Sequence, residues 1–477
     1  MDDQILTFGE TLEKYMKANK VTIERLRRSM NLKSNTSVAR ILKDEHTYKK
    51  VEEFYNKFMT VNPFRLVEYE KKQFVNALEV SRLGKDKYLA NMEMMYFVNK
   101  KPNPQPFTCA KLYGTAPRKP HSLADLFNTY AECKSVRICL VNCVFDDIVQ
   151  SLINCSRDNK KIQIEQYIPY EENIVKEVRN FISILPILNH NNYNCYQAYF
   201  TYHNDLEILN RFNNIIFAFK TSESGKVSID IISLKSNMEY TCVYNENGKP
   251  IFDFFSEIFD NMKTQHNRMK ENLTGTNVIE NLYNVASTML SLEEAWDQIL
   301  IKPNFCFSAL EADVLKTLFS KSDMGNEKAA ALYEMQQKRH ALYCKKSKRH
   351  IGIYTVQGIQ EFLNTGMLSD HVFSMRPFTA AEAKTILKNV IAICEAHPMN
   401  KIHLLKSNIN YNNYQYTFFG QNLLYFSDRY TDYGMEYSYI TSTNEIVEVF
   451  YEFVMNELIP RQCYPADESL EIMKEML

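Results

Sequence analysis

Residues 12–44 contain the pattern that most limits what this chain can fold into. They read LEKYMKANKVTIERLRRSMNLKSNTSVARILKD. Apolar residues recur three and four positions apart, which predicts short amphipathic helices. We expect one helix over residues 8–18, a second from Thr22, a turn at residues 31–33 and a third helix starting near Ser34. Two short helices joined by a tight turn form a helix-turn-helix unit.

Local signals support each boundary of this unit. The Thr22 hydroxyl can cap the second helix, and Ser34 or Asn35 can cap the third. Asn31 lies at the turn, where a residue often enters the left-handed region that Asn tolerates. A fourth helix is expected over residues 48–58. The side chains expected to face inward are Leu12, Tyr15, Met16, Ile23, Leu26, Met30, Val38, Ile41 and Leu42.

The outer face of the third helix is then polar and cationic. Hydroxyl and amide groups can read base edges in the DNA major groove, and an arginine can bind guanine with two hydrogen bonds. Residues 14–50 carry eleven Lys/Arg and three Asp/Glu, a local charge of +8 in a chain whose net charge is −1. A basic head on a mildly acidic remainder is expected when only one end meets phosphate. The candidate DNA-binding residues are Thr22, Arg27, Arg28, Lys33, Ser34, Asn35, Thr36, Ser37, Arg40 and Lys43.

This stretch resembles the helix-turn-helix of the Cro/CI repressor class, often called the XRE type. The resemblance covers residues 8–58, and its departures are Ile23 for a usual Gln, Arg27 for a usual Ala, Asn31 for Gly, and a segment one residue longer before the third helix. It implies that the third helix lies in the major groove of double-stranded DNA and that the protein works as a homodimer. The matching residues are Thr22, Leu26, Met30, Leu32, Val38, Arg40 and Ile41.

The rest of the chain divides by composition and periodicity. After a helix-turn-helix domain at 1–60, we expect a helical connector and a proline-containing linker, KKPNPQPF, at 61–107. Mixed strand and helix patterns then predict an α/β lobe at 108–262, a helical region at 263–350 and a second α/β lobe at 351–477. The predicted fold class is multidomain α+β, with an all-α helix-turn-helix followed by a large mixed α/β body of two similar lobes.

The two lobes show a similar order of elements. In each, a set of strands is followed by an aromatic-rich amphipathic helix, IFDFFSEIFDNM in the first and EIVEVFYEFVMN in the second. We interpret this as a degenerate internal duplication of residues 126–261 and 351–458. A cleft between such lobes is a frequent place for a small ligand.

Motifs for catalysis or metal binding are missing. The eleven cysteines are scattered, with no CxxC and no zinc spacing, which is typical of reduced thiols in a cytoplasmic protein. No phosphate-binding, metalloprotease or serine-hydrolase motif occurs, so we expect no enzyme activity, no cofactor and no metal. The chain shows neither a signal peptide nor an apolar run of membrane length, so no membrane partner is expected.

Two other segments are candidates for a ligand. The loop GMLSDHVFSMRPFT could line a pocket through Asp370, His371 and Arg376, although a capped helix start is the more frequent use of such a sequence. The segment 338–350 holds six Lys/Arg and two His, and could hold a phosphate-bearing ligand, but a solvated basic turn is favoured.

These patterns predict a sequence-specific DNA-binding transcriptional regulator whose body senses a small-molecule or protein effector, or assembles the oligomer. Two alternatives stay open. One is an effector enzyme or toxin in which the head only targets or autoregulates. The other is a protein-interaction adaptor that never meets DNA.

Overall fold

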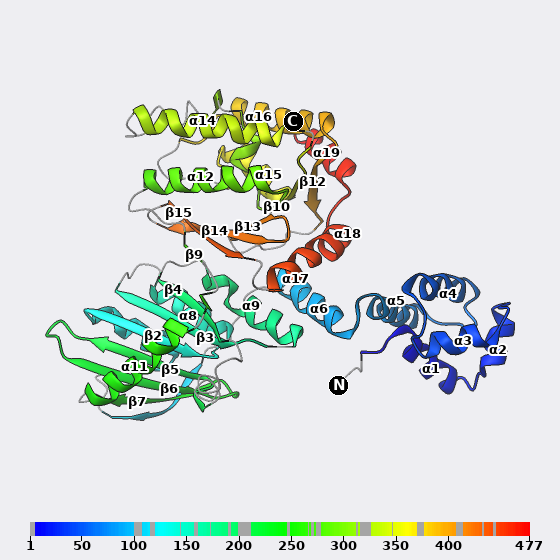
Figure 1. The fold of residues 1–477 in the computed structure, drawn as a ribbon, viewed down its shortest axis with the longest axis horizontal. Coiled ribbons are helices and arrows are strands. Elements are labelled where there is room, and N and C mark those ends of the chain that lie inside the picture. Colours follow the sequence, from blue (N-terminus) through cyan, green and yellow to red (C-terminus); the bar gives the residue numbers. More distant parts are fainter. Residues whose placement is uncertain are drawn as a thin grey trace. The chain divides into compact units, whose positions relative to one another are not determined.

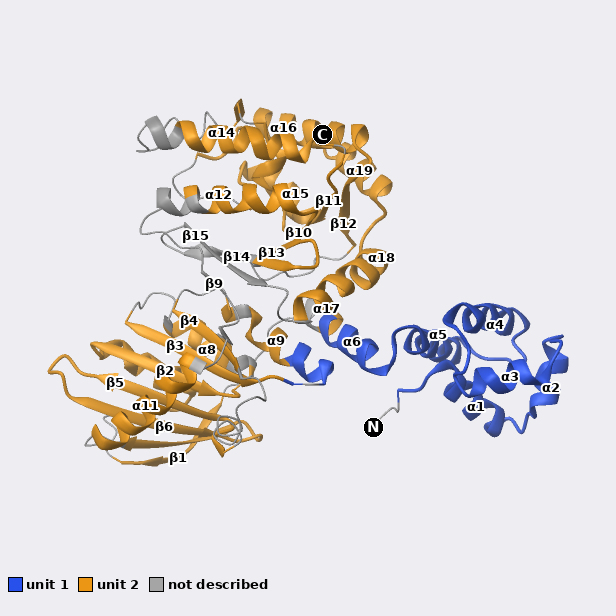
Figure 2. Ribbon diagram, viewed as in Figure 1, with its two compact units in different colours: residues 1–94, 171–179 blue, residues 95–170, 180–477 orange. Residues whose placement is uncertain are grey.

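The computed structural model divides into two compact units, which are coloured separately in Figure 2. The helical unit comprises residues 1–94 and 171–179, and the body comprises residues 95–170 and 180–477. The architecture is multidomain α+β, as predicted. The described residues are 5–99, 107–114, 120–143, 145–156, 161–171, 173–188, 192–198, 211–245, 249–265, 267–268, 271–272, 278–311, 313–314, 326–345, 347–369, 376–406, 414–431, 434–441 and 445–477.

The helical unit is built from helices, and the first three of them begin at a capping side chain. Thr7 and Glu10 form a capping box at the start of the first helix, in which the Thr7 hydroxyl accepts from Glu10 N and the Glu10 carboxylate accepts from Thr7 N. The helices are α1 (Phe8–Ala18), α2 (Ile23–Ser29), α3 (Asn35–Leu42), α4 (Tyr48–Val61), α5 (Glu68–Leu83) and α6 (Lys85–Asn99).

A cluster of phenylalanines forms the core of this unit. The Phe8 ring of α1 lies edge-on to three others, with centroid distances of 6.0 Å to Phe54, 6.2 Å to Phe58 and 5.8 Å to Phe74. The rings come from α1, α4 and α5, and Phe8, Phe58 and Phe74 are fully buried. Edge-to-face contacts add to the free energy of burying each ring, so these three helices form one packed body.

The helical unit therefore extends past residue 60, the boundary that the sequence predicts for the helix-turn-helix domain. Phe74 and Leu78 of α5 belong to the same core as α1 to α4. Two hydrogen bonds also join α5 to α1: Phe8 N donates to Ser81 Oγ at 2.8 Å, and the Tyr15 hydroxyl donates to Gln73 Oε1 at 2.8 Å. The apolar face of α5 closes this core, so the helix is no free connector.

Lobe 1 of the body is built on a sheet that has eight strands in the described residues. Its order is β1-β7-β6-β5-β2-β3-β4-β8. Strands β2, β3 and β4 run parallel, β5 pairs antiparallel with β2, and β6 and β7 continue as a meander. The strands are β1 (Thr108–Tyr113), β2 (Ser135–Val141), β3 (Ile162–Pro169), β4 (Tyr193–Ala198), β5 (Ile215–Thr221), β6 (Val227–Leu234), β7 (Glu239–Asn245) and β8 (Asn267–Arg268).

Helices cover this sheet, and α11 lies across one of its faces (Figure 1). Phe259 and Met262 of α11 pack on Phe217 and Phe219 of β5. Phe217 and Phe219 alternate with Ala218 and Lys220, which face the other side of the sheet because side chains alternate along a strand. The helices of lobe 1 include α7 (Leu123–Thr129), α8 (Asp146–Ser156), α11 (Lys249–Gln265) and, from residue 180 onward, α9 (Ile174–Leu188).

Lobe 2 is built on a second sheet, seven-stranded in the described residues, with the order β12-β11-β10-β13-β14-β15-β9. Strands β10, β11 and β12 are parallel, and β13 pairs antiparallel with β10 before β14 and β15 continue the meander. The strands are β9 (Glu271–Asn272), β10 (Gln298–Ile301), β11 (His350–Thr355), β12 (Asn400–Leu405), β13 (Tyr414–Phe419), β14 (Leu423–Thr431) and β15 (Gly434–Thr441).

Helices also pack on both faces of the lobe 2 sheet. Phe362 of α15 and Leu387 of α16 share a core with Tyr354 and Ile402 of the strands. On the other face, the Phe450 ring of α17 lies 5.3 Å from that of Phe418. The helices include α12 (Val278–Ala295), α14 (Asn326–Tyr343), α15 (Val356–Thr365), α16 (Ala380–Ala396), α17 (Glu445–Phe453), α18 (Ile459–Gln462) and α19 (Ala466–Glu475).

The two sheets repeat one topology. Reading from the parallel edge, β4-β3-β2-β5-β6-β7 of lobe 1 corresponds to β12-β11-β10-β13-β14-β15 of lobe 2, and α11 and α17 follow the last strand of each. The second copy begins earlier than residue 351, because β10 lies between β11 and β13. The segment 263–350, predicted as helical, therefore also supplies a central strand.

The outer edge of β12 is covered by the chain itself. Lys406 N donates to Gln462 O and Tyr464 N donates to Leu404 O, each at 2.8 Å. An isolated bridge joins Leu405 to Cys463. Residues 462–464 thus form hydrogen bonds with backbone N–H and C=O groups of β12 that an uncovered edge strand would leave free for another chain.

The position of α5 gives a first prediction. Replacing Phe74 by alanine should destabilise the whole helical unit by about 3–5 kcal/mol, because it removes a fully buried ring from the aromatic cluster. Native-state hydrogen exchange of α1 and α4 amides in the full-length chain measures this change. Val75→Ala is the matched control, since Val75 is the next residue and is 44% exposed. A head that ends at residue 60 would leave α1 exchange unaffected by Phe74→Ala.

Candidate nucleic-acid interface

Helix α2 is anchored at both ends, as the sequence predicts. The Thr22 hydroxyl accepts a hydrogen bond from Arg25 N at 3.3 Å and so caps the first turn. Leu26 and Met30 are fully buried in the aromatic core. The helix is therefore fixed by one polar and two apolar contacts.

The turn after α2 has the conformation expected of Asn31. Its φ is +49°, in the left-handed region. Leu32 N donates to Arg27 O at 3.0 Å and Asn31 N to Arg28 O at 3.1 Å. This pair of bonds is a Schellman motif, which satisfies the last carbonyls of the helix.

Helix α3 begins at a second cap and buries only its inner face. The Ser34 hydroxyl accepts from Thr36 N at 3.0 Å. Val38 and Ile41 are buried, with 0% and 2% of their surface exposed. Gly9 of α1 lies against the end of α3, where an added Cβ would come within 2.4 Å of Ile41 O. Asn35, Thr36, Ser37 and Arg40 are exposed on the outer face, as predicted.

The predicted DNA-binding residues fall into two groups. The first group serves the motif itself: Thr22 and Ser34 cap helices, the Arg27 guanidinium donates to Leu32 O at 3.0 Å, and Arg28 forms an ion pair with Glu24. The second group is exposed, and its long side chains, Lys33, Arg40 and Lys43, form no hydrogen bond or ion pair with any described residue. The members of this second group are Lys33, Asn35, Thr36, Ser37, Arg40 and Lys43.

One residue of the motif was missed in the sequence. The Lys57 ammonium of α4 donates to Asn31 O at 3.1 Å. Lys57 lies 26 positions after Asn31, and no local pattern marks such a contact. Only the packing of α4 against the core places it beside the turn.

The predicted ligand loop is described only in part. Asp370 and His371 lie outside the described residues. The Arg376 guanidinium binds the Glu382 carboxylate with two hydrogen bonds, of 2.9 and 2.7 Å. Arg376 and the backbone of Thr379 lower the pKa of Glu382 to about 2. Because Glu382 belongs to the capping box of α16, Arg376 stabilises a helix start, which was the alternative reading of this loop.

The basic segment 338–350 is used within lobe 2. Arg339 binds the buried Glu293 with two hydrogen bonds, of 2.9 and 2.7 Å. Lys348 donates to Glu294 O at 2.7 Å. These bonds fasten α14 and the following turn to α12, so Arg339 and Lys348 serve the fold.

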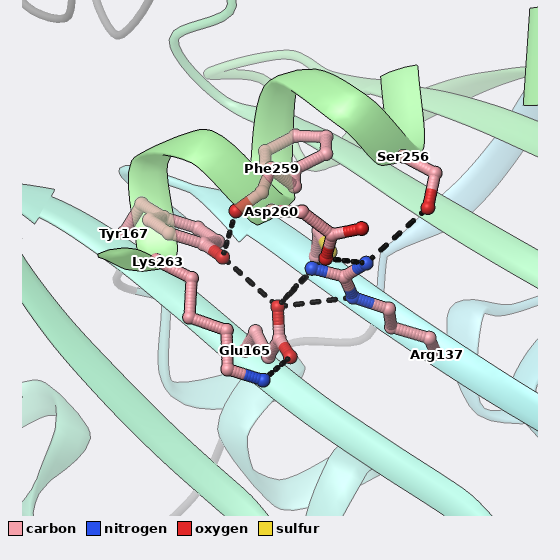
Figure 3. Close-up of polar contacts among 8 residues, drawn as sticks. Arg137, Glu165, Tyr167, Ser256, Phe259, Asp260 and Lys263 are labelled. Carbon is pink, nitrogen blue, oxygen red and sulfur yellow. Dashed lines mark hydrogen bonds and ion pairs between the residues drawn. The ribbon is translucent and has the colours of Figure 1, made fainter. Parts of the chain in front are cut away.

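A network of charged side chains around the buried Glu165 joins α11 to the sheet of lobe 1 (Figure 3). Glu165 of β3 accepts from Arg137 of β2 at 2.7 and 3.0 Å and from Lys263 of α11 at 3.0 Å. The Tyr167 hydroxyl lies 2.9 Å from the same carboxylate, and Arg137 also pairs with Asp260 at 2.7 Å. Every charge has an opposite partner, and the arrangement is that of a structural clamp.

Electrostatics in this network follow from its geometry. Burial acts to raise the pKa of Glu165, but the adjacent Arg137 and Lys263 outweigh it and hold this pKa below the ordinary value of 4.5. Burial raises the pKa of Asp230 on the opposite face, where the Lys220 ammonium lies 2.7 Å away and the Tyr130 hydroxyl 3.0 Å away. Glu165 is thus a stable carboxylate with no proton to exchange near neutral pH.

Lobe 2 contains a polar cluster at the carboxyl ends of β10 and β11. Asn304 accepts from Ser369 N at 2.6 Å, and Gln415 Nε2 donates to Ser369 O at 2.7 Å. Ser369 Oγ and Gln415 Oε1 are buried and have no hydrogen-bond partner among the described residues. Two such atoms at one place are suited to an internal water.

Within the described part of the chain, no three His, Cys, Asp or Glu side chains are grouped as a metal ion requires. No described helix combines the length and the apolar character needed to cross a bilayer. None of the eleven cysteines forms a disulfide.

No family model and no curated protein matches the chain. Among solved structures, it is similar to phosphatidylserine synthase from Haemophilus influenzae Rd KW20, with a TM-score of 0.23 and 9% identity over 74% of this chain and 90% of that one. It is also similar to polyphosphate kinase from Porphyromonas gingivalis, with a TM-score of 0.19 and 9% identity over 74% of this chain and 53% of that one. TM-scores this low carry no argument about fold or activity.

The Glu165 network gives a prediction about pH. A carboxylate with a lowered pKa stabilises the fold fully above the unfolded value of 4.5, and this contribution is lost as the pH falls through the lowered pKa. Glu165→Gln should cost about 3 kcal/mol at neutral pH, because it leaves Arg137 without its buried partner. It should also flatten the loss of stability below pH 4.5.

Thermal unfolding followed by circular dichroism, at neutral pH and at steps below pH 4.5, measures both effects. Glu223→Gln is the control, because Glu223 is exposed and pairs with Lys161 only at 3.5 Å. Equal pH profiles for the wild type and Glu165→Gln would contradict the assigned role.

Proposed function

We propose that this protein is a sequence-specific DNA-binding regulator of transcription, and that α3 is its recognition helix. One observation carries the proposal: the outer face of α3 presents Asn35, Thr36, Ser37 and Arg40 to solvent, while its inner face is locked into the core. A polar, cationic helix face at the front of a helix-turn-helix is suited to the major groove.

The chemistry of this face divides into reading and positioning. Thr36 and Ser37 offer hydroxyls and Asn35 an amide, which can donate to or accept from base edges. Arg40 offers the planar guanidinium that binds guanine O6 and N7 together. We propose that Lys33 and Lys43, which precede and follow α3 in the chain, contact backbone phosphates and so add affinity without sequence preference.

The protein is proposed to bind double-stranded DNA as a homodimer. The resemblance of residues 8–58 to Cro/CI repressors supports this part. Two copies of α3 would then meet half-sites separated by about 34 Å, one turn of the duplex. The body would present the two heads, and an effector would act by changing how they span the half-sites. A cytoplasmic location accords with this role and with cysteines that form no disulfide.

Arg40 provides the sharpest test. Selection of binding sequences from random DNA, followed by fluorescence anisotropy, should yield a preferred site. Arg40→Ala should weaken binding to that site about tenfold to a hundredfold, and should relax preference at one base pair. Arg40→Lys keeps the positive charge but loses the planar guanidinium with its paired donors. It should therefore lose sequence specificity while the salt dependence of binding stays the same.

Three outcomes would count against the proposal. They are the absence of any preferred sequence, equal affinity of wild type and Arg40→Ala, and loss of affinity that is the same on all DNA sequences. An enzyme with a targeting head would instead keep its turnover in Arg40→Ala. Sedimentation of the protein–DNA complex tests the dimer, for which two chains per duplex are expected.

A further inference from the structure

The turn between α2 and α3 exposes two successive carbonyls that the Schellman motif does not satisfy. Asn31 N and Leu32 N donate back to the last turn of α2, but no backbone N–H of the described residues donates to Asn31 O or Leu32 O. Between this turn and the first residue of α3 lie only Lys33 and Ser34. Lys33 is exposed and Ser34 half-buried, so neither anchors the segment in the core.

Each of these carbonyls is held by a cation. The Lys57 ammonium of α4 lies 3.1 Å from Asn31 O, and the Arg27 guanidinium of α2 lies 3.0 Å from Leu32 O. Hydrogen bonds from a charged donor are stronger than those between neutral groups. The two bonds tie the turn to α4 on one side and to α2 on the other.

The same residues mark where this chain departs from the repressors that it resembles. Arg27 and Asn31 replace the usual Ala and Gly, and the segment before α3 is one residue longer. A longer segment costs more conformational entropy to fix in one geometry. Contacts at both turn carbonyls offset that cost.

We propose that Lys57 is a positioning residue for α3, acting through Asn31 O and together with Arg27. Only the expected effect of Lys57 on DNA binding rests on the proposed function; its effect on the turn does not. The Lys57 ammonium donates to a backbone carbonyl of the turn. It therefore sets the orientation of α3, and we expect it to add nothing to the counterion release that accompanies DNA binding.

The first arm of the test needs no DNA. In the full-length chain, Lys57→Met removes the donor and keeps the length and apolar stem of the side chain. Hydrogen–deuterium exchange at the amides of residues 32–42 should accelerate about threefold, the effect of one hydrogen bond at an exposed site. Lys57→Arg keeps a donor and should restore the slow exchange.

Lys50→Met is the matched control. Lys50 lies on the same helix two turns earlier, is exposed, and its side chain contacts no carbonyl of the turn among the described residues. Its replacement removes the same charge from α4. Exchange at residues 32–42 should stay at the wild-type rate.

The second arm measures DNA affinity against salt concentration on the selected site. Lys57→Met should weaken binding about threefold and leave the slope of log affinity against log salt unchanged. Lys43→Met should instead reduce that slope by about one, as the loss of one phosphate contact does. The two variants separate positioning from phosphate contact.

The outcomes are distinct. Unchanged exchange in Lys57→Met overturns the proposal, and so does a reduced salt slope, because it would make Lys57 a phosphate ligand. Faster exchange with unaltered DNA affinity also overturns it, since α3 would then need no such support. If exchange is faster in Lys57→Met but the wild-type protein binds no DNA, the role of Lys57 in the turn stands and only the proposed function is refuted.

Discussion

The ring of Phe8 is the contact on which the helical unit depends. It touches rings from α4 and α5, and the same core buries Val38 and Ile41 of α3. Helix α3 is eight residues long, too short to be stable alone in water. Its orientation is therefore set by neighbours: the aromatic cluster beneath it and the turn before it. The direction in which the exposed face of α3 points therefore depends on the aromatic cluster and on the turn.

The two repeated sheets carry different side chains on the central strands that their closing helices cover. In lobe 1, Arg137 lies opposite Phe219, and Glu165 lies opposite Cys139. In lobe 2, the corresponding strands β10, β11 and β13 pair apolar residues: Ile299 lies opposite Ile351 on one side and Phe418 on the other. Both lobes hold their closing helix with aromatic contacts, Phe259 on Phe217 in one and Phe450 on Phe418 in the other. Lobe 1 adds ion pairs where lobe 2 has aliphatic side chains, an exchange that often leaves stability little changed.

Local features of the fold could be predicted from the sequence. The limits of α1, the caps at Thr22 and Ser34, the left-handed Asn31 and the exposed face of α3 follow from helical period and from the hydrogen-bonding ability of short polar side chains. These signals lie within a few residues of the structure they specify. The fold class and the similar order of the two lobes also follow from element patterns. Whether α3 binds DNA stays a prediction.

Features that depend on distant partners could not be predicted. Phe74 looks like any apolar residue of an amphipathic helix, and only tertiary packing assigns α5 to the head. Arg27 reads as a free cation, although its guanidinium binds Leu32 O. Strand β10 is four residues long, and an apolar run that short cannot be told from a buried helix by periodicity. Residues 462–464, which cover β12, have a wider consequence. They occupy the edge of β12 to which a strand of another chain could otherwise bind. Any event that displaced them would expose this edge as a template for self-association.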